Sequence, residues 1–156
     1  MVAGPFRAAS KPGVFITMVA FFDIYGKHES VVNKKTSLEI SGANGMSGGY
    51  MFALDSWLRR QDGDVALSFR MRLAYGQWDD YVEWPFSRRI TIIITHLRDQ
   101  AKDIRLPIRN SGHDYFKKPA PREWNKIMNT GDISWRTIEH NGFIFNKTLY
   151  VNVEFD

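Results

Sequence analysis

The stretch EWPFSRRITIIITHLRDQ, residues 83–100, decides the fold of this chain. It begins with the rigid aromatic turn Trp84-Pro85-Phe86 and continues into a run of β-branched residues, 89–97, that is typical of a buried strand. Because a proline ring fixes its own φ angle, Pro85 sets the direction of the turn. The two aromatic side chains are then placed to close an open end of a β-structure. This pattern predicts a structural role for Trp84 and Phe86.

Outward from this stretch, apolar residues mostly repeat at every second position, which is the period of a β-strand. We expect strands at residues 14–22, 37–41, 50–58, 65–75, 89–97, 132–139 (a short strand, or one that leads into a helical turn) and 143–155. We expect turns or loops at 43–49, 60–64 (built on Asp62-Gly63), 76–86 and 106–121, and one or two helical turns at 122–128. Seven or eight short strands with little helix predict an all-β fold, a seven- to eight-stranded antiparallel β-sandwich.

The length of 156 residues fits one domain. Residues 1–13 are rich in small and turn-forming residues, so we expect a flexible arm or a cloning remnant there, followed by one domain over 14–156. The chain has no cysteine, which excludes a disulfide framework and thiolate chemistry and suits a cytoplasmic location. No apolar run approaches the roughly 18 residues of a membrane span, so membrane insertion is not expected.

The basic excess is mild, with 21 Lys and Arg against 17 Asp and Glu. These residues are scattered, whereas nucleic-acid-binding domains gather them on one face, so no nucleic-acid partner is expected. No nucleophile, base and orienting group occur together in a recognisable pattern. The histidines have no metal-ligand spacing, and we expect no catalytic residue, no metal and no cofactor; they are His28, His96, His113 and His140.

The order of several motifs resembles the C-terminal TRAF domain, the receptor-binding member of the MATH superfamily. The matching motifs are GGY (48–50) at the start of a strand, EWPF (83–86), ITIIITHLRDQ (90–100), YFKKP (115–119) and FIFNKTLYVNVEF (143–155). The resemblance covers residues 49–156. It implies a TRAF-C/MATH-like β-sandwich that acts as a non-enzymatic adaptor in signalling, similar to the tumour-necrosis-factor-receptor-associated factors.

Domains of this family bind short extended peptides from receptor cytoplasmic tails or signalling proteins. The peptide adds as a strand at a sheet edge, and side-chain pockets supply specificity. The resemblance places the edge at Gly131–Ser134 and the pockets on two strands and before the FKKP motif. The implied peptide-binding residues are Asp55, Trp57, Arg70, His113, Asp114, Tyr115, Gly131, Asp132, Ile133 and Ser134.

Asp55 departs from the family pattern, which has an arginine at the matching position. The inverted charge predicts an altered specificity, in which Asp55 and Asp114 favour a basic ligand residue and Arg70 is the nearby counter-charge. The alternative is that Asp55 and Arg70 pair with each other across neighbouring strands on a solvent-exposed face.

Other functional interpretations stay open. MATH domains also serve as substrate-recognition domains of ubiquitin-ligase adaptors. The aromatic residues Trp57, Trp78 and Tyr81 would suit a carbohydrate-binding β-sandwich. The resemblance also implies a homotrimer in the full-length protein through an upstream coiled coil, although residues 1–35 show no heptad pattern.

Overall fold

A computed structural model describes residues 4–34 and 36–156. Its strands are β1 (Phe15–Phe21), β2 (Ser37–Ser47), β3 (Tyr50–Gln61), β4 (Asp64–Ala74), β5 (Ile90–Ile94), β6 (Ile104–Pro107), β7 (Met128–Asn129), β8 (Ile133–Ser134), β9 (Ile144–Phe145) and β10 (Thr148–Phe155). Its helices are α1 (Ile24–Asn33), α2 (His113–Phe116) and α3 (Trp135–His140), with short 3-10 turns η1 (Asp79–Tyr81) and η2 (Gln100–Lys102).

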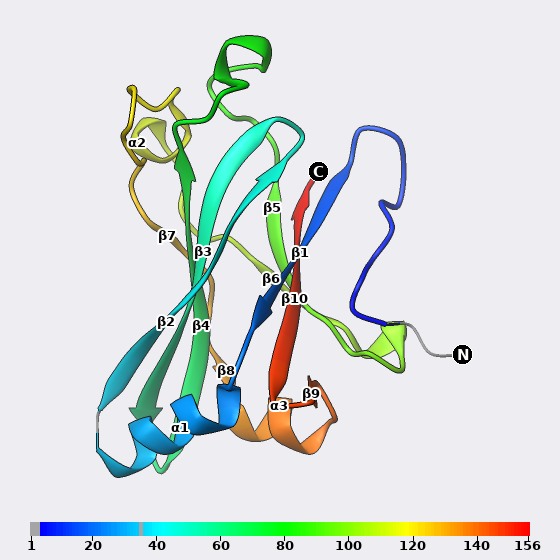
Figure 1. The fold of residues 1–156 in the computed structure, drawn as a ribbon, viewed down its shortest axis with the longest axis vertical. Coiled ribbons are helices and arrows are strands. Elements are labelled where there is room, and N and C mark those ends of the chain that lie inside the picture. Colours follow the sequence, from blue (N-terminus) through cyan, green and yellow to red (C-terminus); the bar gives the residue numbers. More distant parts are fainter. Residues whose placement is uncertain (1–3, 35) are drawn as a thin grey trace.

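Two antiparallel sheets pack face to face (Figure 1). The first sheet has the order β1-β10-β5-β6, with β9 paired to β10, and the second has the order β2-β3-β4-β7, with β8 paired to β4. The predicted antiparallel β-sandwich is therefore confirmed. Of the strands in the described residues, β7, β8 and β9 have two residues each, and the other seven have four or more.

The hairpin of β3 and β4 forms the centre of the second sheet. Its register runs from Met51 opposite Ala74 to Gln61 opposite Asp64. The connecting residues Asp62 and Gly63 have φ angles of 50° and 77°, which the two-residue hairpin turn requires and which glycine adopts at little cost. The expected turn at Asp-Gly is confirmed.

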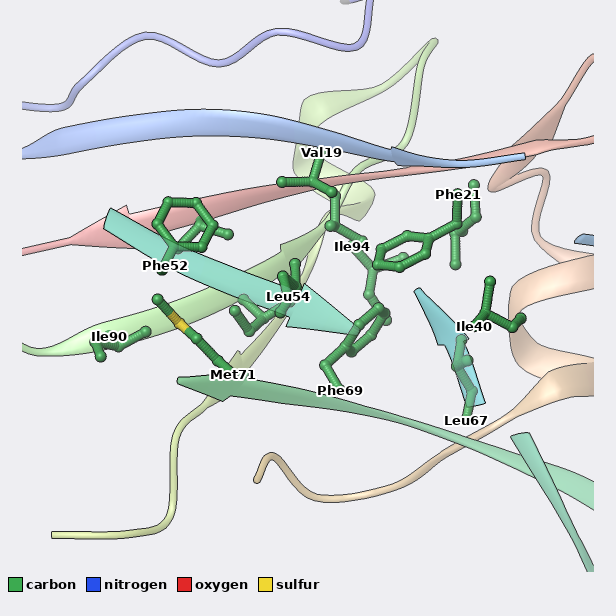
Figure 2. Close-up of a cluster of buried hydrophobic side chains, with 14 of the residues drawn as sticks. Val19, Phe21, Ile40, Phe52, Leu54, Leu67, Phe69, Met71, Ile90 and Ile94 are labelled. Atoms are coloured by element: carbon green, nitrogen blue, oxygen red, sulfur yellow. The ribbon is translucent and has the colours of Figure 1, made fainter. Parts of the chain in front are cut away.

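The hydrophobic core lies between the two sheets. Figure 2 shows Phe52 and Leu54 of β3 and Phe69 and Met71 of β4 directed into the same space as Ile94 of β5. All five side chains are at most 1% exposed. Burying each of them contributes about 1.5–3 kcal/mol of hydrophobic free energy. The alternation of apolar and polar residues along β3 and β4 thus places one face in the core and the other toward solvent.

The aromatic turn closes one end of the sandwich, as the sequence predicts. The ring of Tyr50 lies edge-on to Trp84 and Phe86, with centroids 5.1 and 4.8 Å away. The Tyr50 hydroxyl donates to the carbonyl of Glu83 at 2.7 Å, and the indole N–H of Trp84 donates to the carbonyl of Asp79 at 2.8 Å. Because Phe86 is only 3% exposed, the end of the core is sealed from water.

The turn expected at 43–49 is wrong for most of its length. Strand β2 continues to Ser47 through a register shift, and the turn itself is only Gly48-Gly49, with φ angles of 58° and 87°. Gly45 serves packing instead, because a Cβ there would come within 2.5 Å of the Phe52 ring. Glycine in this segment therefore marks two different features. Gly48 and Gly49 form the tight turn, and Gly45 allows the Phe52 ring to pack closely against β2.

The helical turns expected at 122–128 are also wrong. Trp124 forms a β-bridge with Ala74, and the Asn125 N–H donates to the carbonyl of Leu73 at 2.8 Å. Pairing with β4 therefore outweighs the local helical pattern. Helix α1 was not anticipated, because its sequence has neither an acidic first turn nor a basic last turn. Strand β8 leads into α3, as expected for 132–139.

Residues 4–13 are bonded to the β-sandwich at several points, two of which involve Arg7 and Pro5. The Arg7 guanidinium donates to both carboxylate oxygens of Asp103, at 2.7 and 2.9 Å, and to the carbonyl of His96 at 2.6 Å. The side-chain amide of Asn152 donates to the carbonyl of Pro5 at 2.9 Å. The flexible arm at 1–13 stays a prediction, and residues 1–3 lie outside the described part.

Candidate functional site

The outer edge of the second sheet carries a groove beside β7 and β8. Its volume is about 260 Å³. We call it the edge groove; its walls are Trp57, Arg59, Ser68, Arg109, Asn129, Thr130, Gly131 and Asp132. Three residues that the resemblance implies for peptide binding, Trp57, Gly131 and Asp132, therefore lie around one cavity.

The chain itself occupies part of this sheet edge. The N–H of Asn129 donates to the side-chain carbonyl of Asn110 at 2.6 Å, and the carbonyl of Asn129 accepts from the N–H of Arg109 at 2.9 Å. Thr130 turns inward and exchanges hydrogen bonds of 3.0 Å with the backbone of Phe69. The edge is thus already satisfied at Asn129.

The edge opens at Gly131 and Asp132. Among the described residues, neither backbone N–H of this pair donates to another backbone group. A Cβ at Gly131 would come within 2.7 Å of a guanidinium nitrogen of Arg109, so the arginine side chain lies directly along the glycine. The absence of a side chain at Gly131 allows this approach and keeps the backbone accessible beside a cation.

The charges of the edge groove do not balance. The carboxylate of Asp132 pairs with the guanidinium of Arg59, and both side chains are substantially exposed. Arg109 has no ion-pair partner within residues 4–34 and 36–156. One uncompensated positive charge therefore lines the groove.

Arg70 covers one face of Trp57. Its guanidinium carbon lies 3.3 Å from the centroid of the indole ring, close enough for a cation–π interaction. The same guanidinium donates to the carboxylate of Glu39 at 3.1 Å. Arg70 therefore holds in place an aromatic ring that lines the edge groove.

The alternative of an ion pair between Asp55 and Arg70 is wrong, although the two residues are direct cross-strand neighbours. Arg70 pairs with Glu39 instead, and the carboxylate of Asp55 accepts from the N–H of Gly42 at 3.3 Å. Burial raises the pKa of the Asp55 carboxyl. Asp55 lies on the same sheet face as Trp57 but does not line the edge groove.

Helix α2 places His113, Asp114 and Tyr115 outside the edge groove. The Tyr115 hydroxyl accepts from the side-chain amide of Asn110 at 3.4 Å, and neither residue lines the groove. The carbonyl of Asp114 accepts from the N–H of Lys126, and His113 lines a different cavity. The structure thus separates these three residues from Trp57 and Gly131.

Ile133 and Ser134 extend the edge beyond the groove. They pair with Leu67 and Ala66 of β4 and line, with Asp132, a neighbouring cavity of about 290 Å³. The Ser134 hydroxyl donates to the carboxylate of Asp64. Burial opposes ionisation of Asp64, but hydrogen bonds from Ser134 and the Val65 N–H outweigh it and lower the pKa.

Sequence reasoning missed Arg59, Arg109 and Asn110. Arg59 had a usable signal, because it follows Asp55 and Trp57 at the two-residue period of one strand face. Arg109 and Asn110 gave no such signal, because they follow β6 in an irregular segment whose path only the structure shows.

The described residues contain no group of three or more His, Asp or Glu side chains arranged to hold a metal ion. Within the same residues, no helix has the length and apolar character that crossing a membrane requires.

Comparisons with known proteins agree with this architecture. Residues 43–152 match the family described as TRAF/meprin, MATH domain. The solved structure of TRAF5 from Notothenia coriiceps is similar, with a TM-score of 0.66 and 21% sequence identity over 90% of this chain and 72% of that chain. No curated protein matches the chain. MATH domains are protein-interaction domains, and this chain belongs to the TRAF/meprin MATH domain family.

Proposed function

We propose that the edge groove binds a short extended segment of a partner protein, which adds as a strand beside Gly131 and Asp132. Strand addition requires unpaired backbone groups at a sheet edge and side-chain cavities next to them. The observation that carries the proposal is that Gly131 and Asp132 have free backbone N–H groups at the wall of a 260 Å³ groove. The role is that of a non-enzymatic adaptor domain.

We further propose that the ligand places an acidic residue against Arg109. Its guanidinium has no ion-pair partner among the described residues and lies along the open edge at Gly131. Asp55 and Asp114, on which the hypothesis of a basic ligand depended, lie on β3 and α2 and do not line the groove. The specificity of the groove would then differ from the family pattern in another way. The cation that faces the ligand is Arg109, which follows β6, and not an arginine at the position of Asp55 on β3.

A peptide array tests both parts of this proposal. The purified domain, its Arg109→Gln variant and its Arg98→Gln variant are screened against extended peptides that differ only in one acidic, neutral or basic residue. Arg98 is the matched control because it is exposed and, like Arg109, has no ion-pair partner among the described residues.

We expect the wild type and Arg98→Gln to select the acidic peptides. Arg109→Gln should bind them roughly tenfold more weakly, because a hydrogen bond to a charged group is lost. Selection of basic peptides by the wild type would overturn the proposed charge. Equal binding by Arg109→Gln would remove Arg109 from the site.

The partners that we propose are receptor cytoplasmic tails or signalling proteins that carry such segments, in the cytoplasm. A homotrimer of the full-length protein would add avidity, since a single small groove binds weakly. The same groove would select degradation targets if the domain belongs to a ubiquitin-ligase adaptor. The domains that flank it in the full-length protein distinguish these two contexts.

The structure gives little support for carbohydrate binding. Arg70 covers one face of Trp57, while Trp78 and Tyr81 contact each other in the loop after β4, with ring centroids 5.8 Å apart. Trp57 pairs with Ser68, six residues before the end of β4 at Ala74, which is a separation of about 20 Å along the strand. The three aromatic residues do not form one surface.

A further inference from the structure

The open edge at Gly131 and Asp132 is closed on one side by the chain's own residues 109–110. The N–H of Arg109 donates to the carbonyl of Asn129 at 2.9 Å, and the N–H of Asn129 donates to the side-chain carbonyl of Asn110 at 2.6 Å. Both main-chain groups of Asn129 are therefore bonded in the way that a neighbouring strand would bond them. A strand that adds beside Gly131 and Asp132 cannot continue along this edge past Asn129.

The guanidinium of Arg109 lies at this closed end of the edge groove. A Cβ built on Gly131 would lie 2.7 Å from Nη2, 3.1 Å from Cζ and 3.4 Å from Nε of Arg109, so the guanidinium lies along the Gly131 backbone. Both residues line the groove, and Arg109 has no ion-pair partner within residues 4–34 and 36–156. The closed end therefore combines a blocked main-chain edge with a positive charge that these residues do not compensate.

The charge is reversed at the other end of the open edge. There, residues 133–134 continue the edge into the neighbouring cavity of about 290 Å³. No Lys, Arg or His of the described chain lines this cavity, whose walls include three carboxylates, those of Asp62, Asp64 and Asp132. An anionic group of a ligand is thus repelled at this end of the edge and attracted at the Arg109 end.

The direction of an added strand decides which of its ends lies at Arg109. A strand that runs antiparallel to residues 131–134 has its C-terminal end at Gly131, whereas a parallel strand has its N-terminal end there. At neutral pH a free C-terminus is a carboxylate, and a free N-terminus is largely an ammonium group. The Arg109 guanidinium attracts the first and repels the second, so the charge favours an antiparallel strand that ends in a carboxylate.

We propose that the edge groove binds the free C-terminus of a partner protein, which adds antiparallel to residues 131–134 with its terminal carboxylate on the Arg109 guanidinium. This inference rests on the function proposed above and narrows the acidic group of the ligand to a chain terminus. Guanidinium and carboxylate groups form charge-assisted hydrogen bonds that are frequently bidentate. An internal segment fits less well, because it would have to turn away from the sheet where residues 109–110 block the edge.

The test is a ¹⁵N NMR titration of the whole domain with three peptides. The first is acetyl-Thr-Val-Thr-Val-Thr with a free C-terminal carboxylate, and the second is the same peptide with a C-terminal amide. The third is acetyl-Thr-Val-Asp-Val-Thr-amide, whose only acidic group is internal. We expect the free acid to bind most tightly and to shift the backbone signals of Gly131 and Asp132 and the side-chain Nε–H signal of Arg109. The uncharged amide should bind roughly tenfold more weakly, because it lacks the charge-assisted hydrogen bonds.

Three variants assign the preference for the free acid to Arg109. Arg109→Gln should abolish the preference over the amide, and Arg109→Lys should keep a preference because the charge remains. Arg98→Gln should match the wild type, because Arg98 is exposed and does not line the groove. The variants at position 109 keep the main-chain N–H that bonds Asn129, so the edge itself stays blocked.

A fourth variant, Asn110→Ala, tests the block at Asn129. It frees the N–H of Asn129, which then can pair with a longer ligand strand. The longer peptide acetyl-Thr-Val-Thr-Val-Thr-Val-Thr-amide should therefore bind this variant roughly fivefold more tightly than it binds the wild type, because one more hydrogen bond forms. If Asn110→Ala does not fold, the comparison of free acid and amide on the wild type decides alone.

Equal binding of the free acid and its amide, or a preference that persists in Arg109→Gln, would overturn the proposal. Binding of the internal-acid peptide at Gly131 and Asp132 at least as tight as that of the free acid would also overturn it, while the proposed strand addition would stand. If none of the three peptides shifts Gly131 and Asp132 at millimolar concentration, both the chain terminus and strand addition at this edge are rejected.

Discussion

Replacing Arg7 by alanine should destabilise the domain markedly, although Arg7 lies in a segment without regular secondary structure. The Arg7 and Asp103 side chains are only 4% and 11% exposed, and Nε and Nη2 of Arg7 lie 2.7 and 2.9 Å from the two carboxylate oxygens. Removing one partner of a buried ion pair costs about 3–5 kcal/mol, because the other charge stays buried. Asp103 keeps one hydrogen bond, from the His96 N–H at 2.8 Å, so we expect the lower end, about 3 kcal/mol.

Equilibrium urea unfolding measures this loss. The control is Lys11→Ala, because the Lys11 and Asp156 side chains are 64% and 35% exposed and their atoms are 3.5 Å apart, a geometry that contributes about 0–1 kcal/mol. A double variant, Arg7→Leu with Asp103→Leu, should recover much of the loss, since no unpaired charge remains. A loss from Arg7→Ala no larger than that from Lys11→Ala would show that the Arg7–Asp103 pair does not stabilise the fold and that residues 4–7 lie outside the folded unit.

Two further predictions concern helix α1 and the aromatic end of the sandwich. Burial lowers the pKa of His28 below 6.5, so the unfolded chain binds the proton more tightly and stability is lost as the pH falls from roughly 7 to 5. His28→Phe, which keeps the stack on Trp135, should flatten that part of the Tm–pH curve; parallel curves would contradict this. Tyr50→Phe should lower the free energy of unfolding by about 0.5–1.5 kcal/mol through loss of the 2.7 Å bond to Glu83, and an unchanged value in urea unfolding would argue against that bond.

The elements that the sequence predicted well are those whose signal is local. The alternation along β3 and β4 follows from the two-residue period of a strand with one buried face, and the Asp62-Gly63 turn follows from the φ angles that it needs. The aromatic turn at Trp84–Phe86 was identified because proline and two large rings leave few other roles.

What the sequence missed depends on contacts between distant segments. The sequence predicts a turn at Gly45, because nothing near it in sequence shows that it packs on Phe52. The local pattern predicts a helical turn at Trp124, although this residue pairs with β4. In the candidate site, the resemblance indicated Gly131 and Trp57, but the cation that faces them is Arg109, and its position depends on the path of the chain after β6.

Amide hydrogen exchange followed by NMR, with and without the acidic peptide that the array selects, tests strand addition at the edge groove most directly. We expect that exchange slows at Gly131 and Asp132, whose N–H groups donate to no backbone group of the described residues, while Asn129, already bonded to Asn110, changes little. Binding that leaves exchange at Gly131 and Asp132 unchanged would contradict strand addition at this edge.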